Sequence, residues 1–508
     1  MGLLFENGDI EILEPVLEEK SECRLETEVY LPDYLPDIQK LLRWEIIPRV
    51  QSRDMLAGRI TIEGEAEIRI FYKGMDEDKI RCISVLKEFS HTVAVSEPNS
   101  VYDISTKTTA SINSARASGA RKITIKAEVI TCIVAAENKN LQLVEKISEE
   151  IEGRVEKITA ISKTESTERE IRITEELRLP ESTPPISSLL YTDATVKVVD
   201  ISVGKGRIVI KGELTVKPVY VSASGSGLEC AKFNFPVSQI IDISGVDDSY
   251  ICDGDLQIVS VYAEPDFNSE GNSKTIDCEI VINSVIHAYK LSEYSLVTDV
   301  FSPKNELSVS FENIKHLTCY DFYRDVKNVR GQLECDSEIS GIVDISASSK
   351  ILRVNRVESC MNIEGVITAE VIYRSEEGII CSKKGDIDFG FSFPYACTYD
   401  IRCDAESTVL EMSYTISGGN TIDIRSEIAI KAAVCAEKNI KAVRDITITG
   451  EKDECKNCPI TLYFAEKKES VWEIAKQYNG SVSEIMNENS LETDCIPESR
   501  MLIIPLKQ

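Results

Sequence analysis

The same strand pattern occurs three times along the chain. It is found at residues 59–73 (RITIEGEAEIRIFYK), 207–220 (RIVIKGELTVKPVY) and 360–373 (CMNIEGVITAEVIY). Each copy has an isoleucine two positions before a glycine, then apolar residues at alternate positions, and then a tyrosine. A period of two puts every second side chain on the same face of a β-strand. The chain is therefore predicted to repeat one half-buried strand three times.

The first two copies keep a constant spacing of 148 residues well beyond this strand. Nine residues of the first copy recur unchanged at that spacing: Leu31, Pro32, Pro36, Ile38, Leu41, Leu42, Ile62, Gly64 and Cys82. The third glycine follows 153 residues after the second, and its copy lacks the opening Leu-Pro segment. Solenoid repeats are only about 20 to 50 residues long, so this period indicates a tandem array of whole domains.

Each copy also closes with a second alternating run, at residues 122–130, 274–282 and 420–428. Glycine-containing turn signals separate the runs, and strands joined by short turns are typical of β-sandwich or barrel-like modules. We therefore expect a mainly β protein. Its three tandem β-sandwich-like modules should span residues 1–150, 151–300 and 301–450, the last with a diverged start.

The recurring residues have structural and functional interpretations. The glycine at 64, 212 and 365 would mark a β-bulge or a close backbone approach. The recurring cysteine, taken as Cys82, Cys230 and Cys381, would be a reactive thiol or a core residue, and we favour core packing because no basic setting lies nearby. The segment 31–38 would be a recognition segment or a structural chain entry into the module, and its duplication favours the structural interpretation.

The last fifty residues follow a different pattern. Residues 460–464 (ITLYF) read as a strand, and a helix is predicted to follow with Ser470 as its N-cap. Val471, Ile474, Ala475 and Tyr478 give this helix one apolar stripe. A second helix is predicted over 481–487 and a closing strand over 501–505, so the order is βααβ.

This segment, residues 458–508, resembles the LysM module. The ordered matches to the family pattern are Tyr463, Ser470, Trp472, Ile474, Ala475, Tyr478, Val482, Ile485, Asn487, Asn489, Leu502, Ile504 and Pro505. The resemblance implies a shallow glycan groove between the loop after the first strand and the loop before the last strand. Both loops usually carry glycine, which lets the backbone approach the sugar.

The chain departs from the family at this groove. Lys468 stands for the first glycine, Glu469 for an aspartate and Ser499 for the second glycine. We therefore prefer a protein-binding surface to peptidoglycan or chitin binding, while a folded cap without a ligand stays as a third interpretation. The residues expected to border the partner or groove surface are Lys468, Glu469, Ser470, Trp472, Pro497, Glu498 and Ser499.

A Cys-x-x-Cys pair, Cys455 and Cys458, precedes this module. A zinc site needs four ligands, and the sequence offers no second pair nearby. A thioredoxin-like redox pair needs a βαβ setting that is missing. We expect two linker cysteines and no metal.

The charge balance limits the partners. With 57 basic and 85 acidic residues, the net charge of −28 disfavours nucleic acids and anionic membranes. We see no signal peptide and no apolar run of about 20 residues that would span a bilayer. The expected setting is a reducing cytoplasm, in which most of the 16 cysteines stay as thiols.

In combining tandem β modules, the Leu-Pro-Asp-Tyr-Leu-Pro-Asp-Ile segment and a LysM-like end, the chain resembles the SPOCS-domain spore coat morphogenetic proteins of spore-forming anaerobes. The resemblance implies a non-enzymatic adaptor or scaffold in endospore coat assembly, in the mother-cell cytoplasm at the forespore surface. It implies that the protein partner is the morphogenetic ATPase of the coat basement layer, bound partly through the LysM module.

Two other functions compete with this one. A peptidoglycan- or N-acetylglucosamine-binding envelope protein would use residues 458–508 and would need an export route that the sequence does not show. A wall hydrolase would need paired carboxylates, a Ser/His/Asp set or a metal. The histidines His91, His287 and His316 are far apart, and no GxSxG, HExxH or P-loop motif is present. We expect no enzymatic activity and no cofactor.

Overall fold

The computed structural model describes residues 5–75, 79–95, 100, 102–223, 228–269, 271–395, 401–452 and 460–505, and most of these lie in β-strands. The strands of the first repeat are β1 (Phe5–Tyr30), β2 (Ile38–Leu56), β3 (Arg59–Gly74), β4 (Ile80–Ala94), β5 (Tyr102–Gly119) and β6 (Lys122–Ile147). Those of the second are β7 (Glu152–Arg178), β8 (Ile186–Gly204), β9 (Arg207–Ser222), β10 (Leu228–Cys230), β11 (Phe233–Asp242), β12 (Tyr250–Pro265) and β13 (Thr275–Phe301). Those of the third are β14 (Asn305–Glu334), β15 (Ile339–Val357), β16 (Cys360–Ser375), β17 (Ile380–Pro394), β18 (Arg402–Ser417) and β19 (Thr421–Glu451).

Within each repeat the strands form two antiparallel sheets. In the first repeat these are β1-β6-β5 and β2-β3-β4, and the other repeats have the same order at equivalent strands. In the second repeat, the core joins Ile208 and Ile210 of β9 to Ile276 and Ile280 of β13, so the two sheets pack face to face. The predicted mainly β fold and the tandem repetition of its sheets are confirmed, whereas the exact module boundaries stay a prediction.

The proline-containing segment that opens each of the first two repeats is a structural turn, held by the recurring tyrosine. The hydroxyl of Tyr72 donates to the carbonyl oxygen of Pro36 at 3.3 Å, and Tyr220 makes the equivalent bond at 3.4 Å. The third repeat keeps a shorter version of the turn, in which the hydroxyls of Tyr373 and Ser337 lie 3.3 Å apart. The structure therefore assigns a packing reason to this repeated motif.

The recurring glycine satisfies both roles predicted for it. Gly64, Gly212 and Gly365 each lie opposite a β-bulge of the neighbouring strand. A Cβ atom at Gly64 would collide with the carbonyl oxygen of Arg49 and with the ring of Phe89. Only glycine leaves room for this close approach between neighbouring strands.

The recurring cysteine needs two corrections. By strand pairing, the residue of the third repeat that is equivalent to Cys82 and Cys230 is Ser382, so the predicted match to Cys381 is wrong by one residue. Cys82 is half-buried, and burial raises the pKa of its thiol to about 12. Cys230 is exposed, so the predicted core packing does not hold for it.

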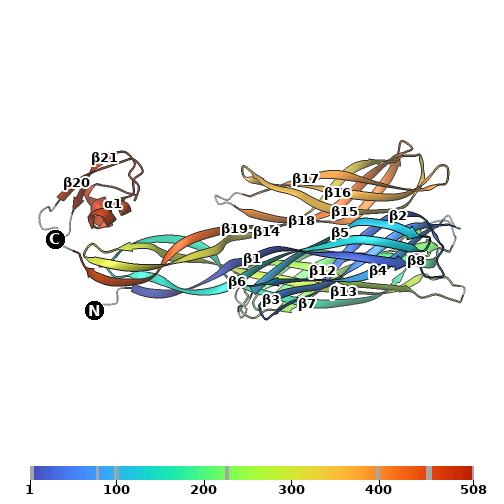
Figure 1. Ribbon diagram of the computed structural model, residues 1–508, viewed down its shortest axis with the longest axis horizontal. Helices are drawn as coiled ribbons and strands as arrows, with labels where there is room; N and C mark the ends of the chain where they lie inside the picture. The colour runs from blue at the N-terminus through green and yellow to red at the C-terminus, as the bar shows by residue number, and fades with distance from the viewer. Residues whose placement is uncertain are drawn as a thin grey trace.

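The longest hairpin of each repeat, β1–β6, β7–β13 and β14–β19, runs on beyond its sandwich. A register shift marks the point where each one leaves, at Pro15/Leu17, Lys290/Leu291 and Thr318/Tyr320. Beyond it the three hairpins pack into a narrow stalk made of residues 5–15, 136–147, 152–161, 291–301, 305–318 and 436–451 (Figure 1). Equivalent residues meet in the stalk core, among them Leu143, Leu296 and Ala442, and Val144, Val297 and Val443.

The sandwiches share a second core, which we call the hub. It too joins equivalent residues of the three repeats, namely Leu42, Leu190 and Val343, and Phe71, Val219 and Ile372. Because equivalent side chains meet in both the stalk and the hub, the three repeats surround one common axis. The single chain thus has the arrangement of a trimer of similar domains.

The C-terminal unit has the predicted order of elements, β20 (Ile460–Ala465), α1 (Val471–Tyr478), α2 (Val482–Glu488) and β21 (Arg500–Pro505). β20 pairs with β21 in an antiparallel sheet, and the apolar stripe of α1 packs against it through Val471, Ile474 and Ala475. Figure 1 shows this unit at the free end of the stalk. Among the described residues, no helix has the length and apolarity needed to cross a membrane.

Candidate functional site

The predicted groove residues come from two loops of the C-terminal unit that lie next to each other. The N–H of Lys468 donates to the carbonyl oxygen of Ile496 at 2.8 Å, and the N–H of Ile496 donates to that of Glu469 at 3.0 Å. The N–H of Lys467 donates to the hydroxyl of Ser499 at 3.0 Å. We call residues 466–469 and 496–499 the loop pair. The structure thus brings most of the predicted surface residues together, although their role stays a prediction.

Lys468 has a backbone conformation that favours glycine. Its φ angle is 71°, in the left-handed region that glycine adopts most easily. The side chain of Lys468 is exposed, as are those of Pro497, Glu498 and Ser499. The loop pair therefore presents side chains and a cation where a glycine-lined groove would present bare backbone.

Glu469 is part of the internal framework of the loop pair. Its carboxylate accepts a hydrogen bond from the hydroxyl of Tyr463 at 2.5 Å and another from the N–H of Glu466 at 2.9 Å. The first of these bonds raises the pKa of Tyr463 to about 12. Glu469 is only half-exposed, and its oxygens are committed to holding the first loop.

Helix α1 is capped by a residue that the sequence pattern did not reveal. Ser470 is the N-cap residue, as predicted, but its hydroxyl donates to Asp494 at 2.9 Å and makes no capping bond. The second carboxylate oxygen of Asp494 accepts the N–H of Trp472 at 2.8 Å. Asp494 lies 24 residues beyond Ser470, so no local sequence signal could have identified it.

Trp472 is not on the exposed surface, and this prediction needs correction. Its side chain is only 4% exposed, and its ring packs edge-on against Phe301 with the centroids 5.0 Å apart. Its indole N–H donates to the carboxylate of Asp299 at 2.9 Å, and the ammonium of Lys476 lies 2.7 Å from the same group. Phe301 and Asp299 belong to the end of the stalk, so α1 covers Trp472 by docking there.

Further contacts fix the C-terminal unit to the stalk. The ammonium of Lys452 donates to the carbonyl oxygen of Ser302 at 2.9 Å and to the side-chain oxygen of Asn479 at 2.5 Å. Arg154 forms a longer ion pair with Asp494 at 3.9 Å. The unit is thus held in one orientation, with α1 against the stalk and β20–β21 away from it (Figure 1).

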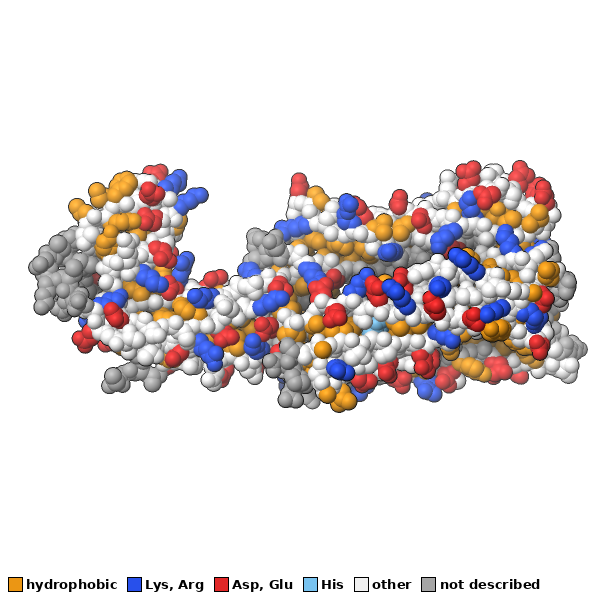
Figure 2. All heavy atoms as spheres, viewed as in Figure 1, with side chains coloured by type: hydrophobic (Ala, Val, Ile, Leu, Met, Phe, Trp, Pro, Cys, Tyr) orange, Lys and Arg blue, Asp and Glu red, His pale blue; other side chains and the backbone are white. Residues whose placement is uncertain are grey.

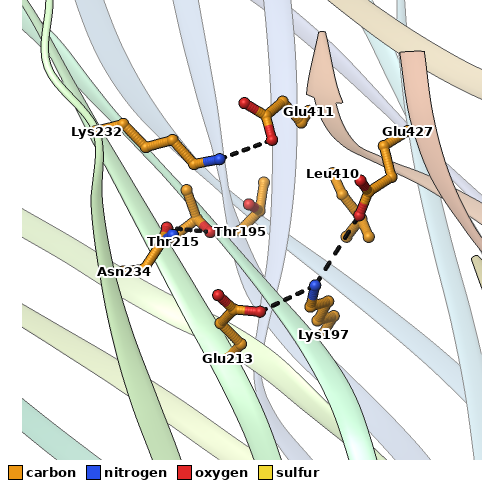
Figure 3. A pocket seen from close by; sticks show the side chains of 9 residues that line it. All are labelled: Thr195, Lys197, Glu213, Thr215, Lys232, Asn234, Leu410, Glu411 and Glu427. Atoms are coloured by element: carbon orange, nitrogen blue, oxygen red, sulfur yellow. Dashed lines mark hydrogen bonds and ion pairs between the residues drawn. The ribbon is translucent and has the colours of Figure 1, made fainter.

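A polar cavity of about 150 Å³ lies between the second and third repeats (Figure 3). From the second repeat, Lys197 forms ion pairs with Glu213 at 2.9 Å and with Glu427 of the third repeat at 3.9 Å. Lys232 forms an ion pair with Glu411, also of the third repeat, at 2.7 Å. Each of these five charged side chains is in an ion pair, although three carboxylates face two ammonium groups, so the cavity is a polar, slightly acidic seam between two repeats.

The three histidines lie in separate environments. His91 lies 3.0 Å from the hydroxyl of Ser21, and His287 lies 2.8 Å from the carboxylate of Asp103. His316 is fully buried in the stalk. Within the ranges described above, no group of three or more His, Cys, Asp or Glu side chains is placed to hold a metal ion. Cys455 and Cys458 lie outside the described residues.

Two segments, residues 37–118 and 185–266, match the model of the family described as SipL, SPOCS domain. They start 148 residues apart, which is the spacing of the first two repeats. The first segment covers strands β2–β5 and the second covers β8–β12. Both leave out the long strands that form the stalk. These two segments are therefore similar to the SPOCS domain, and this similarity points to a sporulation function related to the spore coat. It matches no curated protein and no solved structure at a significant level.

Proposed function

We propose that this protein is a non-enzymatic adaptor in endospore coat assembly. In the mother-cell cytoplasm it binds the morphogenetic ATPase of the coat basement layer at the forespore surface. The observation that carries the proposal is the paired match of residues 37–118 and 185–266 to the SPOCS domain. The resemblance of the C-terminal unit to a LysM module adds the expected partner-binding element.

The shape of the molecule suits a scaffold. Three similar repeats around one axis present three related outer surfaces, and the stalk holds the C-terminal unit at a fixed place beyond them (Figure 1). A partner that polymerises offers many copies of its own surface. Several weak contacts to such a polymer then raise the overall affinity without any single tight site.

The loop pair favours a protein partner over a glycan. Four successive backbone N–H groups, those of residues 466–469, are already bonded within the loop pair. They are not free to bind the acetamido or hydroxyl groups of a sugar. The exposed Lys468 and Glu498 side chains offer charges instead, which are suited to a charged protein surface.

The test is cosedimentation of the full-length protein with the polymerised coat ATPase. Lys468→Glu reverses an exposed charge in the loop pair and should weaken binding roughly tenfold. Lys350→Glu reverses another exposed charge, on β15 of the third repeat, and should leave binding unchanged. A second arm offers peptidoglycan and N-acetylglucosamine oligomers to the same proteins.

The two arms separate the candidate functions. Cosedimentation that is sensitive to Lys468→Glu, with no sugar binding, supports the adaptor. Cosedimentation that is equal for both variants removes the loop pair from the contact. Sugar binding without cosedimentation overturns the adaptor and supports the glycan-binding envelope protein.

A further inference from the structure

Two edge strands of the third repeat, β14 and β17, lie against each other although they belong to different sheets. A Cβ atom at Gly331 of β14 would collide with the side chain of Ile387 of β17. A Cβ atom at Gly385 of β17 would collide with the side chain of Leu333 of β14. Glycine on each strand thus allows the other strand to approach. We call this contact the edge seam, and it consists of residues 331–336 and 381–387.

Two cysteines lie at one end of the edge seam. Cys335 directly follows β14, and Cys381 is the second residue of β17. Cys381 pairs with Tyr373 in the register of β16 and β17, so their side chains share one face. Cys335 and Tyr373 are buried in one core, and Cys381 packs against it. Close to the cysteines in the chain, Asp336 and Lys383 form an ion pair at 2.6 Å across the seam. The two thiols therefore lie beside the same tyrosine, where the two strands are held together.

The other two repeats have no thiol at either position. The first cysteine is equivalent to Leu31 and Leu179, because all three N–H groups donate to the residue just before the last strand of their repeat. The second cysteine is equivalent to Arg81 and Glu229, which pair with the recurring tyrosine. Both positions thus hold cysteine in the third repeat alone. Two thiols at positions that meet in the fold are what a disulfide requires.

We propose that Cys335 and Cys381 form a disulfide bond when the protein meets a small-molecule disulfide such as oxidised glutathione. The thiolate of Cys381 attacks one sulfur of the oxidant, which gives a mixed disulfide and releases one glutathione. The thiolate of Cys335 then attacks the sulfur of Cys381 and releases the second glutathione. Two protein thiols are oxidised, one disulfide is reduced to two thiols, and the two protons pass to the released glutathione.

Burial sets the order of these two steps. Cys381 is half-buried on an edge strand, whereas Cys335 is only 3% exposed. Burial raises the pKa of the Cys335 thiol, and the nearby Lys383 opposes this rise. The charges of Asp336 and Cys381 add to it, so the two sulfurs are close enough to act on each other. Because the thiolate is the nucleophile, Cys335 reacts slowly with an oxidant in solution and attacks the neighbouring mixed disulfide instead.

The bond responds to the redox setting of the protein. In a reducing cytoplasm both thiols stay reduced, and the bond forms where small disulfides are abundant. Glutathione is anionic, but Figure 2 shows basic and acidic side chains mixed over the face that it presents, so the net charge of −28 is not concentrated there. The bond joins the start of the third sandwich to β17 and restricts the unfolded chain, which stabilises the fold. The proposal does not depend on the partner in coat assembly.

The test is oxidation of the folded full-length protein with oxidised glutathione, followed by alkylation of the remaining thiols and tryptic digestion without a reductant. Trypsin releases residues 331–350 and 375–383 as peptides with one cysteine each, so mass spectrometry identifies the linked pair. Cys335→Leu introduces the residue that the other two repeats have, and Cys381→Ser removes the second thiol. Cys360→Ser is the matched control, because Cys360 is also half-buried and lies on β16 of the same repeat.

The expected result is a linked peptide pair in the original protein and in Cys360→Ser, and none in the other two variants. Oxidation should also raise the urea concentration at the midpoint of unfolding in the original protein but not in Cys381→Ser. Glutathione that stays bound to Cys381 without a link would overturn the proposal. So would a link that forms only in urea, or no link although the exposed Cys230 has reacted with glutathione. Neither readout involves the coat ATPase, so this proposal and the adaptor function can fail separately.

Discussion

Arg43 of the first repeat donates to Asp344 of the third repeat, with 2.6 Å between Nη2 and Oδ2, and the two residues occupy equivalent positions. Tyr191, at the same position of the second repeat, donates its hydroxyl to the same carboxylate at 3.0 Å. The same position thus holds a cation in the first repeat, a hydroxyl in the second and an anion in the third. The cation and the hydroxyl both bind the anion in the hub. A trimer of identical chains would bring three like residues together here. Because the three repeats differ at this position, the contact fixes which repeat lies beside which around the axis.

Removing the anion from this cluster should destabilise the protein strongly. The Arg43 side chain is buried, its guanidinium lies 4.1 Å from the centre of the Phe71 ring, and its Nε lies 2.9 Å from the Glu45 carboxylate, so Asp344→Ala leaves a buried cation with one of these two carboxylate partners. Because Glu45 remains, we expect a loss of roughly 3 kcal/mol in the free energy of unfolding, at the low end for breaking a buried ion pair, measured with urea. Glu26→Ala is the control, because Glu26 and Lys126 form an exposed ion pair, worth less than about 1 kcal/mol. Equal losses in the two variants would contradict the role of the hub.

The recurring glycine should tolerate no side chain. Gly64→Ala places a methyl group against the backbone of Arg49 and the ring of Phe89, so we expect a loss of roughly 1–3 kcal/mol in the free energy of unfolding. Gly341 on β15 has nothing within 4 Å of the same added atom. Gly341→Ala should therefore be neutral or stabilise by up to about 1 kcal/mol. A neutral Gly64→Ala would show that the bulge can open at little cost.

The contact between the first and second repeats should weaken as the pH rises. Burial lowers the pKa of His287, but the charge and hydrogen bond of Asp103 outweigh this and raise it above the ordinary 6.5. The folded pKa then exceeds the unfolded one, so this stabilisation is complete below pH 6.5 and is lost as the pH rises through the folded pKa. Urea unfolding at several pH values should show that the free energy of unfolding falls as the pH rises above 6.5. His287→Gln should remove this fall.

His91 provides the control of opposite sign. Burial lowers its pKa, so the folded protein holds this ring neutral and loses stability as the pH falls through 6.5 and the unfolded chain takes up the proton. His91→Gln should therefore reduce the loss of stability below pH 6.5. It should leave the fall in stability above pH 6.5 in place. If His287→Gln left that upper slope unchanged, another group would have to account for it.

Alternation and repetition made the sheets predictable. The strand at 59–73 and its two copies show a period of two, and the spacing between Gly64 and Gly212 indicated whole repeated domains. The hub was not predictable, because its contacts join residues as far apart as Arg43 and Asp344. Nothing near either residue in the sequence shows that the equivalent residues at positions 43, 191 and 344 would meet on one axis.

The C-terminal unit shows the same limit. Its order of elements follows from local patterns such as the stripe of α1. The cap from Asp494 and the burial of Trp472 do not, because the first depends on a loop 24 residues away and the second on the stalk. The LysM resemblance placed Trp472 at the border of the groove as a candidate stacking platform, although in that motif the residue is more often part of the core.

Asp299 should decide whether the C-terminal unit stays docked. Its carboxylate accepts from the indole of Trp472 and the ammonium of Lys476, and hydrogen bonds to charged groups contribute about 1.5–3 kcal/mol each. In a Trp44→Phe background, Trp472 is the single tryptophan and reports the contact. Asp299→Ala should shift its fluorescence emission to the red and increase its quenching by acrylamide several-fold. Asp277→Ala, at an exposed position of the same strand, should change neither. An unchanged spectrum in Asp299→Ala would mean that packing on Phe301 alone holds the unit to the stalk.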